Sequence, residues 1–117
     1  MKNRIAITLL FNVCIALWTA PVHAGPTLKD YEELKENKYF LAHLHGIGVG
    51  YSWANTYLSA IRKSPPLYCE PEKVALNADN YFQILDEYIK KQGGILQQST
   101  SISMLLLYAL REALPCN

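Results

Sequence analysis

Apolar residues recur along the middle of the chain at alternating steps of four and three positions. This spacing places them on one side of a single α-helix, because an α-helix completes a turn every 3.6 residues. The stripe predicts a helix of about six turns that ends near residue 61. Its members are Phe40, Leu44, Ile47, Tyr51, Ala54, Leu58 and Ile61.

A short helix is predicted before the long one and a non-helical connector after it. Thr27 and Asp30 are typical of a helix N-terminus, where hydroxyl and carboxylate groups complement free backbone N–H groups. The polar stretch 35–38 separates this helix from the next. Segment 64–71 contains three prolines and cannot be helical, because proline lacks a backbone donor and restricts the residue before it.

Two more helices are predicted after the connector. Asn77 is typical of an N-cap and Gly93 of a helix end. The last helix begins among residues 99–101 and runs to Leu114, and because segment 104–107 is apolar on every side, we expect this helix to be covered all round. No stretch alternates with the period of a strand. The predicted fold class is therefore all-α, a compact bundle of four or five helices.

The long helix also carries a row of small residues. Ala42, Gly46, Gly50 and Ala54 lie four positions apart and form a smooth surface that another helix can approach closely. Glycine inside a helix costs up to about 1 kcal/mol relative to alanine, so a contact should compensate for it. Two interpretations stay open: the row packs inside the bundle, or it forms an interface between two subunits.

The first 24 residues have the pattern of a secretory signal peptide. A positively charged start precedes an apolar run at residues 5–20, and Val22 and Ala24 are small enough for a signal peptidase. The run of roughly 16 residues is shorter than the roughly 20 that a membrane-spanning helix needs. We therefore expect cleavage after Ala24, export to the periplasm and one mature domain, residues 25–117, that has no membrane anchor.

Export decides the state of the cysteines. Cys14 is removed with the signal, so the mature domain keeps only Cys69 and Cys116. Two cysteines in an oxidising compartment can form only one bridge, which predicts a Cys69–Cys116 disulfide. Closing a loop of nearly 50 residues stabilises a fold by about 4 kcal/mol in the chain-entropy model. That is a large share of the net stability of a small domain.

Charge and side-chain chemistry narrow the classes of function. Of the 11 Lys and Arg, Lys2 and Arg4 lie in the signal, which leaves nine against ten Asp and Glu and no basic surface for nucleic acid or an anionic membrane. His43 and His45 point to different sides of a helix and lack a third ligand, so no metal or other cofactor is predicted. No serine lies in a strained nucleophile turn. These residues favour a binding protein over an enzyme.

Several motifs occur in an order that is typical of one family. Residues 39–40 (YF) enter the glycine-rich helix, and residues 52–55 (SWAN), 66–71 (PLYCEP) and 109–116 (ALREALPC) follow. Together they resemble the Rap/Tai family of bacterial immunity proteins associated with type VI secretion. The resemblance covers nearly all of Tyr39 to Cys116. Its most specific parts are the Cys-x-Pro after an aromatic residue and the closing Leu-Pro-Cys.

The resemblance implies a function in protection from a toxin. A family member is expected to be a periplasmic helical protein, often a homodimer, that binds a peptidoglycan amidase effector and blocks its active-site cleft. The producing cell and its siblings are thereby protected. The alternative from a different class is a periplasmic helical protein with another role, such as a small acid-stress chaperone.

Two connectors are candidate contacts for the amidase, because an occluding inhibitor needs an element that is stiff before binding. Segment 63–72 is stiffened by prolines and the bridge, and Tyr68 within it is an aromatic of the kind enriched at binding hot spots. Tyr68 has a second interpretation, as a core residue that packs over the disulfide. Segment 93–101 is polar and flexible and can offer hydrogen-bond donors and acceptors to a cleft, and it is the first choice for direct contact, through Gln97, Gln98 and Ser99.

Overall fold

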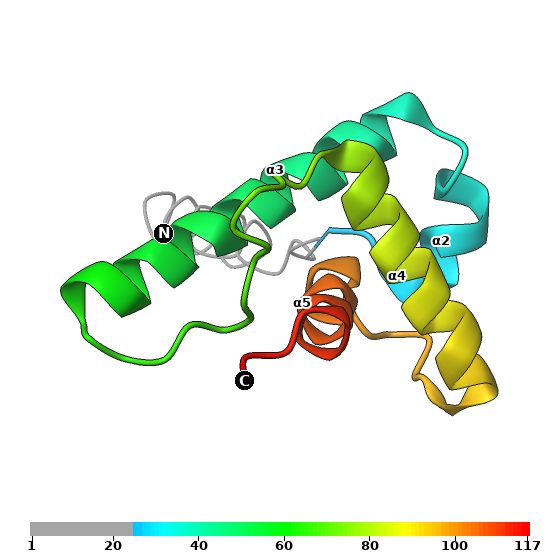
Figure 1. Cartoon of the computed structure of the whole chain (residues 1–117). Helices are drawn as coiled ribbons and strands as arrows, with labels where there is room; N and C mark the ends of the chain where they lie inside the picture. Colours follow the sequence, from blue (N-terminus) through cyan, green and yellow to red (C-terminus); the bar gives the residue numbers. More distant parts are fainter. Residues whose placement is uncertain (1–24) are drawn as a thin grey trace, which may run out of the picture.

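Four α-helices and two short helical turns make up residues 25–117, the part of the chain that the computed structural model describes (Figure 1). The helices are α2 (Leu28–Leu34), α3 (Lys38–Thr56), α4 (Ala78–Gln92) and α5 (Ile102–Ala113). A π-helical turn, Tyr57–Ile61, extends α3, and a 3-10 turn, Gly93–Ile95, follows α4. These residues contain no strand, only an isolated antiparallel bridge between Thr27 and Ser101. The predicted all-α fold class is confirmed.

The expected signal peptide, residues 1–24, lies outside the described residues. Cleavage after Ala24 and export therefore remain predictions. Within residues 25–117, none of the helices has the length and the apolar character needed to cross a membrane.

Polar side chains at the helix ends fix where the helices begin. The Asp30 carboxylate accepts hydrogen bonds from the backbone N–H and the hydroxyl of Thr27, both at 2.9 Å. Asn77 and Asn80 bond reciprocally, each side-chain oxygen accepting from the other's backbone N–H at 3.0 Å. Helix α4 ends at Gly93, whose φ of 56° is costly for a residue with a side chain. These boundaries agree with those predicted from the sequence.

The core lies where α3, α4 and α5 meet, and α2 closes it beside α4 (Figure 1). Two tyrosine hydroxyls link helices across it. Tyr31 donates to Asp86 at 2.8 Å, which joins α2 to α4, and Tyr51 donates to the carbonyl of Ser103 at 2.8 Å, which joins α3 to α5. The buried apolar side chains that the helices contribute are Tyr31, Phe40, Leu44, Tyr81, Leu85, Ile102, Leu105, Leu106, Ala109 and Leu110.

Helix α5 is less enclosed than its sequence indicates. Leu105 and Leu106 are fully buried, whereas Met104 and Tyr108 are 44% and 42% exposed. Helices α3 and α4 pack against α5, and the side that carries Met104 and Tyr108 faces outward. The expectation that α5 is covered all round is therefore wrong, because an apolar run on a helix does not specify how many neighbours the helix has.

Helices α3 and α4 come very close at Gly48. The ring of Tyr81 packs directly on this glycine, and a Cβ atom added there would overlap three ring atoms. Tyr81 is only 2% exposed, so its ring has little room to move aside. At Gly46 and Gly50, by contrast, an added Cβ would have no other atom within 4 Å. Gly48 is thus the glycine of α3 that the internal packing requires.

This difference predicts opposite effects of alanine at neighbouring glycines. Gly48→Ala forces a side chain into the Tyr81 ring and should lower the free energy of unfolding by about 1–3 kcal/mol. Gly46→Ala is the matched control and should raise it by up to about 1 kcal/mol, because alanine is the better helix former. Urea unfolding followed by circular dichroism, at a concentration where all three proteins are monomeric, measures both. Equal stabilities of the two variants would contradict this packing.

Candidate protein interaction surface

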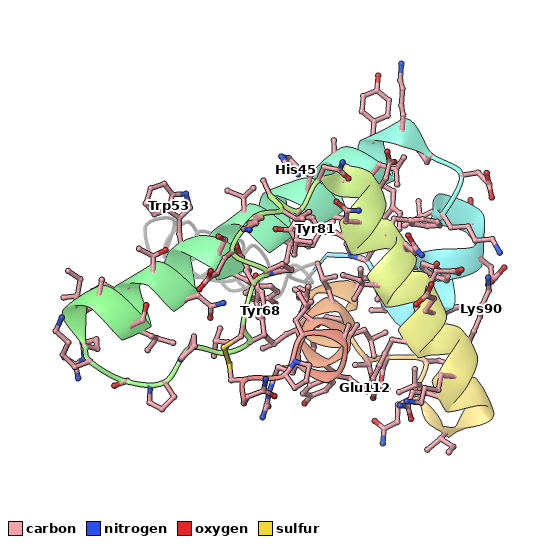
Figure 2. All side chains as sticks on the ribbon, in the orientation of Figure 1. His45, Trp53, Tyr68, Tyr81, Lys90 and Glu112 are labelled. Carbon is pink, nitrogen blue, oxygen red and sulfur yellow. A yellow bond between two sulfur atoms is a disulfide. The ribbon has the colours of Figure 1, made fainter. Side chains whose placement is uncertain are left out.

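The side of α3 that points away from α4 and α5 is apolar and uncharged. From Tyr39 to Ile61 the sequence has no Asp, Glu, Lys or Arg. Tyr39 is 72% exposed and Trp53 71% exposed, and the Trp53 side chain stands out from the helix (Figure 2). We define the outer face of α3 as Tyr39, Ala42, Gly46, Val49, Gly50, Trp53 and Tyr57, which share one side at helical spacing and are all exposed.

The predicted row of small residues belongs to this outer face. Ala42, Gly46 and Gly50 are exposed and Ala54 is half-buried. The interpretation that the row packs inside the bundle is therefore wrong for the two glycines, where an added Cβ atom would meet no neighbouring helix or side chain within 4 Å in the described residues. The other interpretation, an interface between two subunits, stays a prediction.

Contiguous exposed aromatic surface usually marks a site where another molecule binds. Trp and Tyr are also the residue types that most often dominate the free energy of binding at protein interfaces. Sequence reasoning missed Tyr39, Trp53 and Tyr57 as surface residues and placed Ile61 on the buried stripe, although Ile61 is 68% exposed. The signal in the sequence that could have revealed this surface was the absence of charged residues on the side of the helix opposite the buried stripe.

Tyr68 is not a surface contact. It is 1% exposed, and its hydroxyl donates to Glu70 at 3.0 Å. Burial, together with this carboxylate, raises the pKa of the Tyr68 phenol. The second interpretation, in which Tyr68 packs in the core, is the correct one, because a large aromatic next to the bridge fills the space between the connector and the helices (Figure 2).

The connector, segment 63–72, is held to the helices by the Asn55 side chain, which we call the clamp, and by the disulfide bridge. The side-chain amide of Asn55 donates to the carbonyl of Tyr68 at 2.9 Å and accepts from the N–H of Leu67 at 2.7 Å. Cys69 forms the predicted disulfide with Cys116, and its N–H donates to the carbonyl of Leu114 at 2.9 Å. The connector is therefore fixed to α3 at one point and to the end of α5 at another.

The glutamine loop, residues 96–101, exposes the side chains predicted for direct contact. Gln97, Gln98 and Ser99 are all exposed. The backbone of the loop is fixed, since the carbonyl of Gln98 accepts from the N–H of Lys29 at 3.0 Å and the carbonyl of Thr100 accepts from that of Leu28 at 2.9 Å. The loop thus presents exposed polar side chains on an anchored backbone, which differs from the flexible segment that the sequence predicts.

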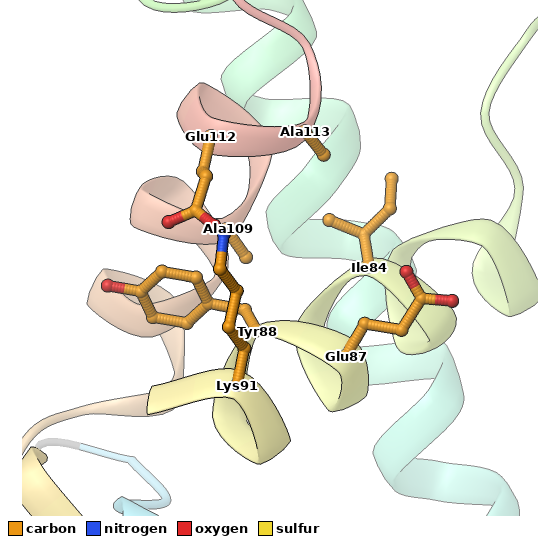
Figure 3. Close-up of a pocket in the computed structure, with 7 residues that line it drawn as sticks. All are labelled: Ile84, Glu87, Tyr88, Lys91, Ala109, Glu112 and Ala113. Atoms are coloured by element: carbon orange, nitrogen blue, oxygen red, sulfur yellow. Dashed lines mark hydrogen bonds and ion pairs between the residues drawn. The ribbon is translucent and has the colours of Figure 1, made fainter. Parts of the chain in front are cut away.

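The described surface includes two clefts. One, of about 250 Å³, separates α4 from α5 and contains an ion pair between Lys91 and Glu112 (Figure 3). Glu112 raises the pKa of Lys91, so this lysine is charged at neutral pH. The other cleft, of about 220 Å³, lies between the end of α3 and the connector. Its lining is Ser52, Asn55, Thr56, Ser59, Pro66, Tyr68, Cys69 and Glu70.

Metal-ligating side chains do not gather in residues 25–117. No three His, Cys, Asp or Glu side chains there are placed to hold a metal ion. His43 and His45 are both exposed on α3, and the His45 ring lies 6.2 Å from that of Tyr81. Both cysteines of this part of the chain are in the disulfide.

No family model, curated protein or solved structure matches the chain. What the molecule binds must therefore be inferred from its own surfaces. The outer face of α3, the glutamine loop and the cleft beside the connector are the features available for that inference.

The clamp predicts a large effect for a single side chain. Asn55→Ala leaves the N–H of Leu67 and the carbonyl of Tyr68 without partners, and each unpaired buried group costs about 1–3 kcal/mol. Thr56→Ala is the matched control, since the exposed Thr56 hydroxyl only donates to the carbonyl of Ser52, and should change stability by less than about 0.5 kcal/mol.

Denaturant unfolding measures the free energies of the two variants, and hydrogen exchange of the Leu67 amide reports the connector directly. Faster exchange at Leu67 is expected in Asn55→Ala and not in Thr56→Ala. Unchanged exchange in both variants would show that Asn55 does not hold the connector.

Proposed function

We propose that this protein is a periplasmic immunity protein that binds and occludes a peptidoglycan amidase effector of type VI secretion. The observation that carries the proposal is the glutamine loop, whose exposed polar side chains stand on a backbone that is anchored to α2. The uncharged outer face of α3 with its exposed aromatic side chains is in addition typical of a protein that binds other proteins. The secretory signal, the single disulfide and the motifs at residues 39–116 support the same proposal from the sequence.

A rigid body suits an inhibitor that works by occlusion. Ordering a loose loop on binding consumes affinity, whereas an element that is already fixed does not. Here the connector is fixed by Asn55 and the disulfide, and the backbone of the glutamine loop is fixed by hydrogen bonds to α2. Both connectors are therefore preorganised for contact with a partner.

The outer face of α3 is suited to pair with a second copy of itself. Several positions on this side of α3 lie at matching distances on either side of Gly48, and in an antiparallel pair with its two-fold axis at that level these positions would meet their counterparts, whereas Val49 and Trp53 would lie opposite Ile47 and His43. Such an interface is isologous, with one patch used by both subunits. The matching positions are Gly46 with Gly50, Ala42 with Ala54, and Tyr39 with Tyr57.

A homodimer formed in this way leaves the glutamine loop available for the amidase. The loop belongs to the α4–α5 connection, not to α3. Gln97, Gln98 and Ser99 offer both hydrogen-bond donors and acceptors to the polar groups of an enzyme cleft. We propose them as the contact residues of the effector.

The dimer proposal predicts that a bulky side chain at Gly50 separates the subunits. A Cβ atom added at Gly50 lies more than 4 Å from every atom beyond the adjacent residues and helix backbone, so Gly50→Leu should keep the monomer fold, and leucine is a better helix former than glycine. Light scattering should give twice the monomer mass for the wild-type protein and the monomer mass for Gly50→Leu. Circular dichroism should show unchanged or higher helicity.

Gln83→Leu is the control for this experiment, since it adds an equally large exposed leucine to α4, away from the outer face. It should remain a dimer. A wild-type protein that is monomeric at the highest attainable concentration rules out the homodimer without affecting the immunity proposal.

The immunity proposal predicts inhibition at a ratio near one to one. Purified protein should block peptidoglycan cleavage by the small secreted cysteine amidase expected from the neighbouring gene. Gln97→Ala combined with Gln98→Ala should weaken inhibition at least tenfold, a loss of about 1.4 kcal/mol, with a nearly unchanged melting temperature because both side chains are exposed.

The matched control is Gln83→Ala, which replaces an exposed glutamine on α4. This variant should inhibit like the wild-type protein. If excess folded wild-type protein leaves the amidase fully active, the immunity proposal fails for that pair. If the double variant inhibits like the wild-type protein, the effector contacts another surface.

A further inference from the structure

The cleft between the end of α3 and the connector has an unusual polar lining. Three hydroxyl residues, Ser52 and Thr56 of α3 and Ser59 of the π-helical turn, line it together with Glu70 of the connector. Pro66 and the disulfide residue Cys69 contribute the apolar part of its wall. The cleft is preformed, because the connector is held by Asn55 and by the bridge.

Most donor groups in this cleft are already used. The Thr56 hydroxyl donates to the carbonyl of Ser52 at 3.1 Å, and the Ser59 hydroxyl donates to that of Asn55 at 2.8 Å. The hydroxyl of Tyr68 donates to one oxygen of Glu70, and the amide of Asn55 is bonded to the connector backbone. Oxygen lone pairs therefore outnumber free protons along the lining.

Glu70 adds a negative charge to these acceptors. Only one of its two oxygens receives the Tyr68 hydroxyl, and within residues 25–117 no Lys, Arg or His forms an ion pair with it. A group that satisfies such a lining must donate several hydrogen bonds and carry a positive charge. A guanidinium does both, since it has five N–H donors and no acceptor.

We propose that this cleft binds the guanidinium of an arginine side chain on the protein partner. The planar head would donate to Glu70 and to the hydroxyl oxygens of Thr56 and Ser59, and its methylene stem would lie along Pro66 and the disulfide. The inference rests on the proposed function only for the identity of the partner that carries the arginine. The binding chemistry belongs to the cleft alone.

The test uses a small arginine derivative in place of the partner. Nα-acetyl-arginine amide is titrated into ¹⁵N-labelled protein and followed by NMR, and the citrulline analogue, which has the same shape without the charge, is titrated in parallel. Saturable shifts are expected at Ser52, Thr56, Ser59 and Glu70 for arginine, with a dissociation constant on the order of millimolar, and much smaller shifts for citrulline.

Two variants test whether the carboxylate of Glu70 supplies the negative charge that binds arginine. Glu70→Gln keeps an oxygen that can accept the Tyr68 hydroxyl, so the fold should be unchanged by circular dichroism, but arginine binding should weaken at least fivefold. Glu72→Gln removes an exposed carboxylate two residues further along the connector and should bind arginine like the wild-type protein. Shifts that do not saturate, equal binding of citrulline, or full binding by Glu70→Gln would each overturn the proposal.

The outcome is separable from the immunity proposal because the amidase is absent from this titration. If the cleft binds no arginine, the cleft proposal fails, and the immunity proposal is still tested independently by the inhibition assay with wild-type protein. If the protein binds arginine in the cleft but does not inhibit the amidase, the arginine site is supported and the immunity proposal fails.

Discussion

The packing of the Tyr81 ring on Gly48 fixes the rotation of α3 about its own axis, and most features of the surface follow from that rotation. With Gly48 against α4, the same side of α3 buries Leu44 and brings Asn55 to the connector. The opposite side then faces outward. No residue other than glycine fits at this contact without displacement of Tyr81. The absence of a side chain at position 48 therefore decides which residues α3 exposes.

The second constraint is the attachment of the long connector. This segment has no helical hydrogen bonds of its own, so its backbone groups need other partners. Asn55 supplies two of them, the carbonyl of Leu114 supplies another, and the Cys69–Cys116 disulfide adds a covalent link. The result is a rigid wall beside α3, and the cleft proposed to bind arginine exists only because this wall is held in place.

The exposed aromatic side chains are the feature of α3 that most favours the binding of another protein. A domain that presents Tyr39, Trp53 and Tyr57 on one uncharged helix side is prone to non-specific association unless another protein surface covers that side. Pairing of two copies through the outer face would bury it and leave the polar loop and the acceptor-lined cleft for a different partner. The three surfaces differ in chemistry, which allows each to have its own occupant.

The sequence by itself determined the all-α class, the helix boundaries set by Asn77 and Gly93, and the disulfide pairing. These depend on local hydrogen bonding and on cysteine count, which can be read from short segments. Which glycine packs inward, the burial of Tyr68, the open side of α5 and the outward position of Trp53 were decided only by the tertiary structure. The reason is physical: helical periodicity gives the sides of a helix, but the number and placement of neighbouring helices determine which of two apolar sides is covered.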